Sequence, residues 1–285
     1  MGAPSVANQQ QFANTITLIA QQLRTRLRDR VMVDANWNGS KKFYNQYGKN
    51  TMTEILSRYQ ETPISSVDHR RRMVTPRYWV VNDLLDPVDA LAMCGDPLSA
   101  YSQANVAAAN RQQDQTIIDA ISGAAYSDET GSTSNTIAAA QKVTAGGTGL
   151  SLVKLTAASK ALNKAEVPSE DRTLVLNSEA LDDVLNTTGI TSVDYNSVKA
   201  LMSGEIDQFM GFTWVRSELL PTDSSSSRLL YAFQKSGVQL AIQKEPTGRL
   251  TERPDKNYGW QAYISMCMGA VRLEEEKVIQ IAIAE

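Results

Sequence analysis

Residues 97–122 contain no glycine and, after Pro97, no proline, and this uninterrupted stretch constrains the fold more than any other feature of the sequence. Asp96 at a cap position and Pro97 in the first turn are typical of a helix N-terminus. At about 1.5 Å per residue, the helix would be about 39 Å long. Its middle, residues 110–114, is polar, whereas apolar residues stand on both sides. We therefore predict a long helix that lies across a thin domain and is partly exposed.

Residues 36–82 are rich in aromatic residues and arginine, and poor in the aliphatic residues that build a core. Residues 73–81 are strand-like but include Pro76, which favours a sheet edge or a break in the strand. We predict a long extended excursion in the form of a hairpin. Its composition is typical of surfaces that are buried against another chain.

Three consecutive arginines, Arg70 to Arg72, follow Asp68-His69 in this segment, and Arg77 joins them. A guanidinium suits a phosphate, but it equally suits the carboxylates of a neighbouring subunit. We favour inter-subunit contact over a solvated surface, and a solvated surface over contact with nucleic acid.

Residues 8–28 show apolar residues at spacings of three and four, the pattern of an amphipathic helix. Arginines at its C-terminal end would complement the helix dipole. Such a helix at a chain end needs a surface to pack against. The side chains that we expect at contacts between subunits are Phe12, Ile16, Leu23, Trp37, Tyr44, Tyr47, Tyr59, Arg70, Arg71, Arg72, Arg77, Trp79 and Arg111.

The rest of the chain indicates an α+β protein, in which helices and strands are segregated rather than alternating. Helices are expected at 84–93, 151–165 and 178–185, and strands at 173–176, 210–215, 229–233 and 278–283. Residues 260–268 and 271–273 look like two strands that meet at Gly269. Residues 123–150 look like a loop with a hairpin through 136–143, and the serines at 224–227 like a mobile tip.

The net charge of −3 and the isoelectric point near 5.4 argue against a DNA binder of the kind that neutralises phosphates with many cations. The two cysteines, Cys94 and Cys267, lack the spacing of a zinc site or a disulfide framework. No signal peptide and no apolar run of about 20 residues is present, so we expect no membrane contact.

Patterns typical of catalysis are almost absent from the sequence. The single histidine, His69, stands beside three arginines, which would oppose its protonation as a general base. Neither HExxH nor GxSxG occurs, and the glycines at 146–149 lack the lysine of a phosphate loop. The acidic runs 182–183 and 274–276 look like solvated faces. We expect no catalytic residue, cofactor or metal, although a Ser–Lys pair leaves no spacing by which it could be excluded.

The order of these parts resembles the tailed-phage major capsid proteins with the HK97 fold, in particular the small group without a large N-terminal prodomain. Four stretches carry the resemblance. Residues 68–86 are similar to the return limb of the E-loop, and residues 96–120 to the spine helix. Residues 209–221 are similar to a strand of the A-domain, and residues 269–281 to the closing strands of the P-domain.

The resemblance implies an N-terminal arm at 1–35, an E-loop at 36–82, and a first P-domain part at 83–172 that includes the spine helix 97–122. It also implies an A-domain at 173–255 and closing P-domain strands at 256–285. It implies a major capsid protein that self-assembles into pentamers and hexamers of an icosahedral head around double-stranded DNA. The virion is then its location, and the host cytoplasm the place of its synthesis.

The chain begins almost at the arm, so the resemblance implies a separate scaffolding protein, with portal and decoration proteins as further partners. Lys41, Lys42 and Lys49 lie in the E-loop, but the sequence does not show the Lys–Asn cross-link of the family's namesake. The alternatives are an encapsulin-type bacterial compartment with the same fold and, from a different class, a hydrolase with an unrecognised site.

Overall fold

The computed structural model describes residues 22–35, 37–85, 97–128, 130–186 and 208–284. The chain divides into two compact units. Unit 1 takes residues 1–25, 78–113 and 244–267, and unit 2 takes residues 26–77, 114–243 and 268–285. The division into arm, E-loop, P-domain and A-domain stays a prediction.

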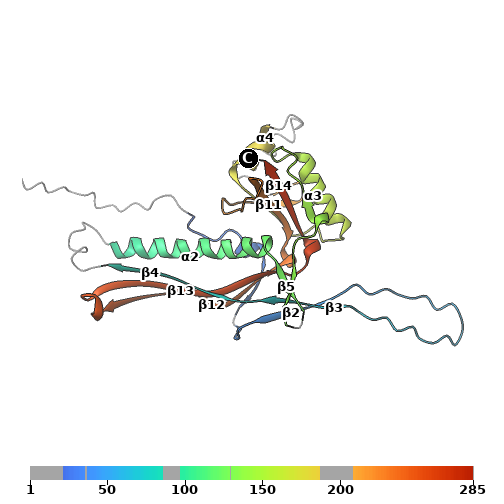
Figure 1. Ribbon diagram of the computed structural model, residues 1–285, viewed down its shortest axis with the longest axis horizontal. Coiled ribbons are helices and arrows are strands. Elements are labelled where there is room, and N and C mark those ends of the chain that lie inside the picture. The colour runs from blue at the N-terminus through green and yellow to red at the C-terminus, as the bar shows by residue number, and fades with distance from the viewer. Residues whose placement is uncertain (1–21, 36, 86–96, 129, 187–207, 285) are drawn as a thin grey trace, which may run out of the picture. The chain divides into compact units, whose positions relative to one another are not determined.

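Helix α2 (Pro97–Ser122) begins and ends where the sequence predicts. Together with β4 (Arg77–Leu85), β12 (Val238–Arg253) and β13 (Gly259–Arg272), it provides most of unit 1. These strands belong to a sheet in the order β1-β12-β13-β4, and α2 runs alongside them (Figure 1). A single-turn helix, η4 (Pro254–Lys256), connects β12 to β13.

Within the polar middle of α2, residues 110–112 are partly exposed, as predicted, whereas the last two residues are buried. Gln113 and Asp114 are each 1% exposed. The Asp114 carboxylate accepts hydrogen bonds from the backbone N–H groups of Arg26 and Leu27, at 2.9 and 3.2 Å. A buried carboxylate is therefore tolerated here because it satisfies two backbone donors.

A six-stranded sheet in unit 2 has the order β7-β14-β11-β8-β10-β9. The strands are β7 (Lys142–Val143), β8 (Arg172–Leu176), β9 (Gln208–Phe209), β10 (Phe212–Arg216), β11 (Ser227–Gln234) and β14 (Val278–Ala284). All residues of β8 are buried, as predicted, because it is a central strand. β11 runs antiparallel to both β8 and β14, whereas β10 runs parallel to β8.

Helices α3 (Leu152–Lys164) and α4 (Ser178–Asn186) belong to the same unit and agree with the prediction. α3 packs beside β14 (Figure 1). The Ser151 hydroxyl caps α3 by accepting from the Lys154 N–H. The Lys154 ammonium in turn donates to four backbone carbonyl oxygens, including those of Thr148 at 2.6 Å and Ala282 at 3.2 Å.

The predicted hairpin within residues 36–82 is present. β2 (Lys42–Tyr47) pairs antiparallel with β3 (His69–Val74), in a register that sets Tyr47 opposite His69. The loop between the two strands extends away from them (Figure 1). The break at Pro76, between β3 and β4, also agrees with the prediction. β5 (Ala125–Ser127) and β6 (Thr133–Asn135) complete a sheet in the order β2-β3-β5-β6.

Strands β1 and β12 are among those that were not predicted. β1 (Met32–Ala35) pairs parallel with the start of β12, with Met32 opposite Gln239. The predicted amphipathic helix 8–28 lies mostly outside the described residues, and residues 22–27 are not helical. A single turn, η1 (Arg28–Arg30), precedes β1 instead. The other single turns are η2 (Ala139–Gln141), η3 (Lys235–Gly237) and η5 (Glu275–Lys277).

Several predicted boundaries were wrong. The hairpin of the glycine-rich region is formed by β5 and β6, not by residues 136–143. Strand β10 begins only after a turn at Met210-Gly211. Of the predicted helix 84–93, residues 84–85 belong to β4 and 86–93 lie outside the described residues. In the serine run, residues 224–226 form a turn, and Ser227 is the first residue of β11.

Gly269 lies inside the single strand β13 and does not separate two strands. A Cβ atom at this position would stand 2.7 Å from the carbonyl oxygen of Thr75 and 3.0 Å from Cγ2 of Val74. The segment that joins β3 to β4 passes so close to this position that only glycine fits. In the part of the chain that the structure describes, no helix is long and apolar enough to cross a membrane.

Candidate functional site

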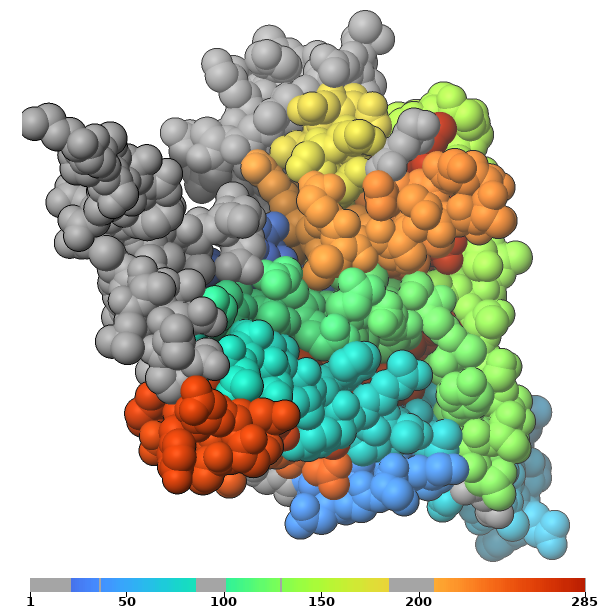
Figure 2. All heavy atoms as spheres, turned by 60° about the vertical axis from the view of Figure 1, so that its left-hand side comes forward, coloured from blue at the N-terminus to red at the C-terminus, as the bar shows by residue number. Residues whose placement is uncertain are grey.

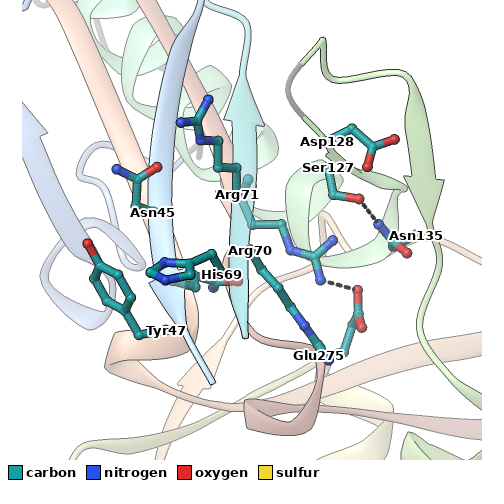
Figure 3. A pocket seen from close by; sticks show the side chains of 11 residues that line it. Asn45, Tyr47, His69, Arg70, Arg71, Ser127, Asp128, Asn135 and Glu275 are labelled. Atoms are coloured by element: carbon teal, nitrogen blue, oxygen red, sulfur yellow. Dashed lines mark hydrogen bonds and ion pairs between the residues drawn. The ribbon is translucent and has the colours of Figure 1, made fainter. Parts of the chain in front are cut away.

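A polar pocket of about 630 Å³ opens at the base of the β2–β3 hairpin (Figure 3). We call it the arginine pocket. β2 supplies Asn45, Gln46 and Tyr47, and β3 supplies His69 and the three consecutive arginines. The remaining lining residues are Ser127, Asp128, Asn135 and Glu275.

The pocket exists because β5 accompanies β3 over a short distance only. Their register pairs Arg72 with Ser127 and Met73 with Tyr126. Residues 69–71 lie beyond this pairing, so β3 and the β5–β6 hairpin separate there. The sequence reason is the short length of β5, which spans Ala125–Ser127.

Arg72 forms the floor of the pocket, and its side chain is 7% exposed. Nε donates to the carbonyl oxygen of Leu273 at 3.0 Å, and Nη2 donates to Glu275 Oε1 at 2.7 Å. The remaining nitrogen, Nη1, is buried without a hydrogen-bond partner among the described residues. Arg72 thus supports the hairpin from within its own chain and keeps one donor unused.

The other basic residues of the pocket are more exposed. Arg70 Nε donates to Asp68 at 2.9 Å, and this pair is well solvated. Arg71 is exposed, and no ion pair joins it to another described residue. His69 meets Tyr47 edge to face, with ring centroids 5.1 Å apart. Figure 3 shows both rings beside the arginines, at the hairpin end of the pocket.

The loop that joins β2 to β3, residues 48–68, is the second feature of this region, and we call it the hairpin loop. Apart from Gly48 and Val67 it is exposed throughout. It carries five large apolar side chains that are more than half exposed: Met52, Ile55, Leu56, Tyr59 and Ile64. Exposed apolar residues in this number mark an interaction surface.

The structure distributes the predicted contact residues unevenly. Phe12 and Ile16 lie outside the described residues. Leu23, Tyr47, Tyr59, Arg70, Arg71 and Arg77 are exposed, and Trp79 and Arg111 are half-buried. Trp37 belongs to a core cluster with Val74, Ala125, Ala241 and Val271, against which Tyr44 packs. Trp37 and Arg72 therefore offer little surface to a neighbour.

Tyr44 is tied to its own chain as well. Its hydroxyl donates to Asp34 Oδ2 at 3.0 Å, and Lys42 Nζ forms an ion pair with the same oxygen at 2.5 Å. Burial raises the pKa of the Tyr44 hydroxyl above its ordinary value, and the hydrogen bond to Asp34 contributes a smaller increase. The contact to Asp34 is one that no sequence pattern indicated.

Unit 1 carries an apolar surface that the prediction missed. Tyr78, Val80 and Leu84 alternate along β4 and are about half exposed, as are Leu250, Tyr258 and Trp260 near the turn between β12 and β13. Figure 2 shows β4 and this turn side by side on one face. The sequence did contain this signal, because apolar residues of β4 stand at both odd and even positions and therefore point to both faces of the sheet.

A Ser–Lys pair does occur in unit 1. Lys244 Nζ donates to Ser265 Oγ at 2.7 Å. Ser265 is only 1% exposed, and the ammonium lies over the ring of Tyr78, 5.7 Å from its centroid. A hydroxyl buried in this way is out of reach of a substrate, so the pair serves packing. Within the described ranges, no three His, Cys, Asp or Glu side chains converge as metal ligands would.

A family model described as phage capsid protein matches residues 5–285 of the chain. The chain belongs to the phage capsid protein family. None of the curated proteins matches this sequence at a significant level. A match over almost the whole length means that the arginine pocket and the hairpin loop are parts of a capsid-family chain.

Solved structures agree with the family in fold. The capsid of Ralstonia phage GP4 has a TM-score of 0.76 at 9% identity, covering 100% of this chain and 98% of that one. The capsid structure of cyanophage P-SCSP1u has a TM-score of 0.74 at 17% identity, covering 96% and 92%. A Mycobacterium phage Che8 structure has a TM-score of 0.71 at 17% identity, covering 95% of each chain. The predicted α+β fold of the HK97 type is confirmed.

Proposed function

We propose that this protein is the major capsid subunit of a tailed phage, and that it self-assembles into the pentamers and hexamers of an icosahedral head. The family match over residues 5–285 carries the proposal. The protein is then a structural component of the virion, and its function is performed by contacts between identical chains.

The physical support comes from surface that a lone chain leaves uncovered. The hairpin loop exposes Met52 and Tyr59 completely and Ile64 almost completely. A further apolar surface lies along β4. Full burial of a large apolar side chain contributes about 1.5–3 kcal/mol. Several such side chains per chain provide enough free energy to stabilise an interface, and many interfaces per subunit then act together.

The interior of the head would hold double-stranded DNA without binding its sequence. A net charge of −3 suits this role, because a strongly basic subunit would hold the packaged DNA by its phosphates. The parts that the resemblance assigns remain part of the proposal: the arm at 1–35, the E-loop at 36–82 and the A-domain at 173–255. So do a separate scaffolding protein and a portal as partners, and synthesis in the host cytoplasm.

Negative-stain microscopy and sedimentation velocity of the expressed full chain, alone and with the products of neighbouring genes, test the proposal. We expect rings, shells or tubes of regular subunits. A compact monomer at high concentration under all of these conditions would contradict the proposal, particularly with the hairpin loop protected from proteases.

A further inference from the structure

A tyrosine of unit 1, Tyr78 near the start of β4, has its hydroxyl among polar groups from two neighbouring strands. The hydroxyl oxygens of Tyr78 and of Tyr263, on β13, lie 3.1 Å apart. The Tyr78 oxygen is also hydrogen-bonded to the Ser265 hydroxyl of β13 and to the Lys244 ammonium of β12. Three groups that can donate a hydrogen bond therefore converge on one phenol oxygen.

The direction of these hydrogen bonds follows from the groups that surround Tyr78. Lys244 Nζ donates to Ser265 Oγ at 2.7 Å, which leaves the hydrogen of the Ser265 hydroxyl for Tyr78. The bond between the two tyrosines raises the pKa of Tyr263, as is expected of the partner that donates its proton. Tyr78 is thus the acceptor of both hydroxyl groups.

An oxygen with this many donors around it is suited to carry a negative charge. A neutral phenol must also place its own proton, whereas a phenolate oxygen can accept all three hydrogen bonds. The bonds from Ser265 and Tyr263, with a further contribution from the charge of Lys244, lower the pKa of Tyr78. The Lys244 ammonium also lies over the Tyr78 ring, 5.7 Å from its centroid. The surroundings therefore favour the phenolate form of Tyr78.

The donors are shielded from solvent, but Tyr78 itself is accessible. Ser265 is 1% exposed, and Lys244 and Tyr263 are half-buried, whereas Tyr78 is 56% exposed. A reagent in solution can therefore reach the tyrosine although it cannot reach the serine. A weak nucleophile becomes reactive when neighbouring groups stabilise its deprotonated form.

We propose that Tyr78 is a nucleophilic tyrosine and a site of covalent modification by acyl electrophiles. Its phenol oxygen forms a bond to the acyl carbon, the bond from that carbon to the leaving group breaks, and the phenol proton passes to the leaving group. Lys244, Ser265 and Tyr263 are positioning residues, which stabilise the phenolate and do not react. The inference concerns the single chain and does not depend on the proposed function.

Acetylation by N-acetylimidazole tests the inference on the full chain, at a concentration low enough to keep the subunits apart. The reaction produces an acetyl ester of tyrosine and free imidazole, and mass spectrometry of peptides gives the rate at each tyrosine. Tyr258 is the matched control in the same molecule. It belongs to the same unit, is 60% exposed, and receives no hydrogen bond at its hydroxyl from a described residue.

We expect Tyr78 to react faster than Tyr258 near neutral pH, by a factor of at least about three. The phenolate fraction rises about tenfold for each unit by which the pKa falls. The lower nucleophilicity of a more acidic group offsets about half of this gain on a logarithmic scale. As the pH is raised, the rate at Tyr78 should also level off earlier than the rate at Tyr258.

Three variants distinguish the effect of the donors from the effect of exposure. Tyr263→Phe removes one donor and Lys244→Met removes the cation. Each should lower the ratio of the Tyr78 rate to the Tyr258 rate at least about twofold, because each group contributes part of the stabilisation. Lys160→Met, at an exposed lysine of α3, is the control for loss of a cation and should leave the ratio unchanged. Thermal melting checks that all variants fold.

Equal rates at Tyr78 and Tyr258 in the unmodified chain would overturn the inference. A fast reaction at Tyr78 that neither Tyr263→Phe nor Lys244→Met slows would also overturn it, since exposure alone would then explain the rate. Should Lys244→Met melt early, the conservative Tyr263→Phe decides, because it removes a single oxygen atom.

Discussion

The Arg272 guanidinium donates a hydrogen bond to the carbonyl oxygen of Ile121, across 2.7 Å, in the last turn of α2. It also donates to the carbonyl oxygens of Gly123 at 3.0 Å and Asn135 at 2.9 Å. Arg272 is completely buried, and desolvation lowers its pKa. One side chain of β13 thus satisfies carbonyl groups at the C-terminus of the long helix and in the β5–β6 hairpin.

Replacement of this residue should destabilise the chain severely. Arg272→Met leaves three carbonyl oxygens without their donor, and we expect a loss of about 3–5 kcal/mol of unfolding free energy. Denaturant unfolding followed by circular dichroism measures it. Arg249→Met, at an exposed arginine of β12, is the control and should change the free energy by less than about 0.5 kcal/mol.

The Asp114 carboxylate should stabilise the segment at Arg26 and Leu27, the first residues of unit 2. Asp114→Ala removes the acceptor of the Arg26 and Leu27 N–H groups, and we expect a loss of about 2–3 kcal/mol. The exposed Asp119, on the same helix, provides the control Asp119→Ala, with a loss below about 0.5 kcal/mol. Equal losses in both variants would mean that helix propensity, not the buried bonds, determines the effect.

Gly269 should resist even the smallest side chain. Gly269→Ala puts a methyl group 2.7 Å from the Thr75 carbonyl oxygen, and a shift of the backbone should cost about 1–3 kcal/mol. Gly248→Ala is the matched change, since a Cβ there meets only Ile264 Cγ1 at 3.8 Å. Thermal unfolding of the two variants is the measurement. A lower melting temperature for Gly269→Ala than for Gly248→Ala would show that the nearby backbone of Thr75 requires glycine at position 269.

The hairpin loop should matter for assembly and not for the stability of the chain. Leu56→Ser with Tyr59→Ser should change the unfolding free energy by less than about 0.5 kcal/mol, because both side chains are already in water. The same variant should assemble poorly in sedimentation velocity. Val153→Ser, at a valine of α3 that is 76% exposed, should assemble normally. Poor assembly of both variants would argue that any loss of surface apolarity has this effect.

Asp255 should titrate at an unusually low pH. A hydrogen bond from Arg253, with Nη2 at 2.6 Å, lowers its pKa to about 2 from the ordinary value of 3.8. A carboxyl with a depressed folded-state pKa stabilises the fold above its unfolded pKa. That contribution is lost as the pH falls from about 4 to about 2. NMR titration should give a pKa near 4 in Arg253→Gln; an unchanged low value would exclude the guanidinium as the cause.

Several parts of the fold could be predicted from the sequence because local physics determines them. α2 begins at Pro97 and continues to Ser122, since no residue in between breaks a helix. Pro76 ends β3 by lacking a backbone donor. The aromatic and arginine-rich composition of 36–82 predicted an extended hairpin, and the apolar run of β8 predicted a buried strand. The sequence also indicated the family.

Tertiary structure decided which polar residues are buried and where glycine is required, because these features depend on contacts with residues that are distant in the sequence. The polar Asp114 is buried only because two backbone donors of the N-terminal segment reach it. Gly269 continues a strand because another segment crosses it closely. Of the three adjacent arginines, Arg72 is buried and paired with Glu275, whereas Arg71 remains exposed at the pocket. Composition alone cannot distinguish these two arginines, since the difference depends on which face of β3 packs against Leu273 and Glu275.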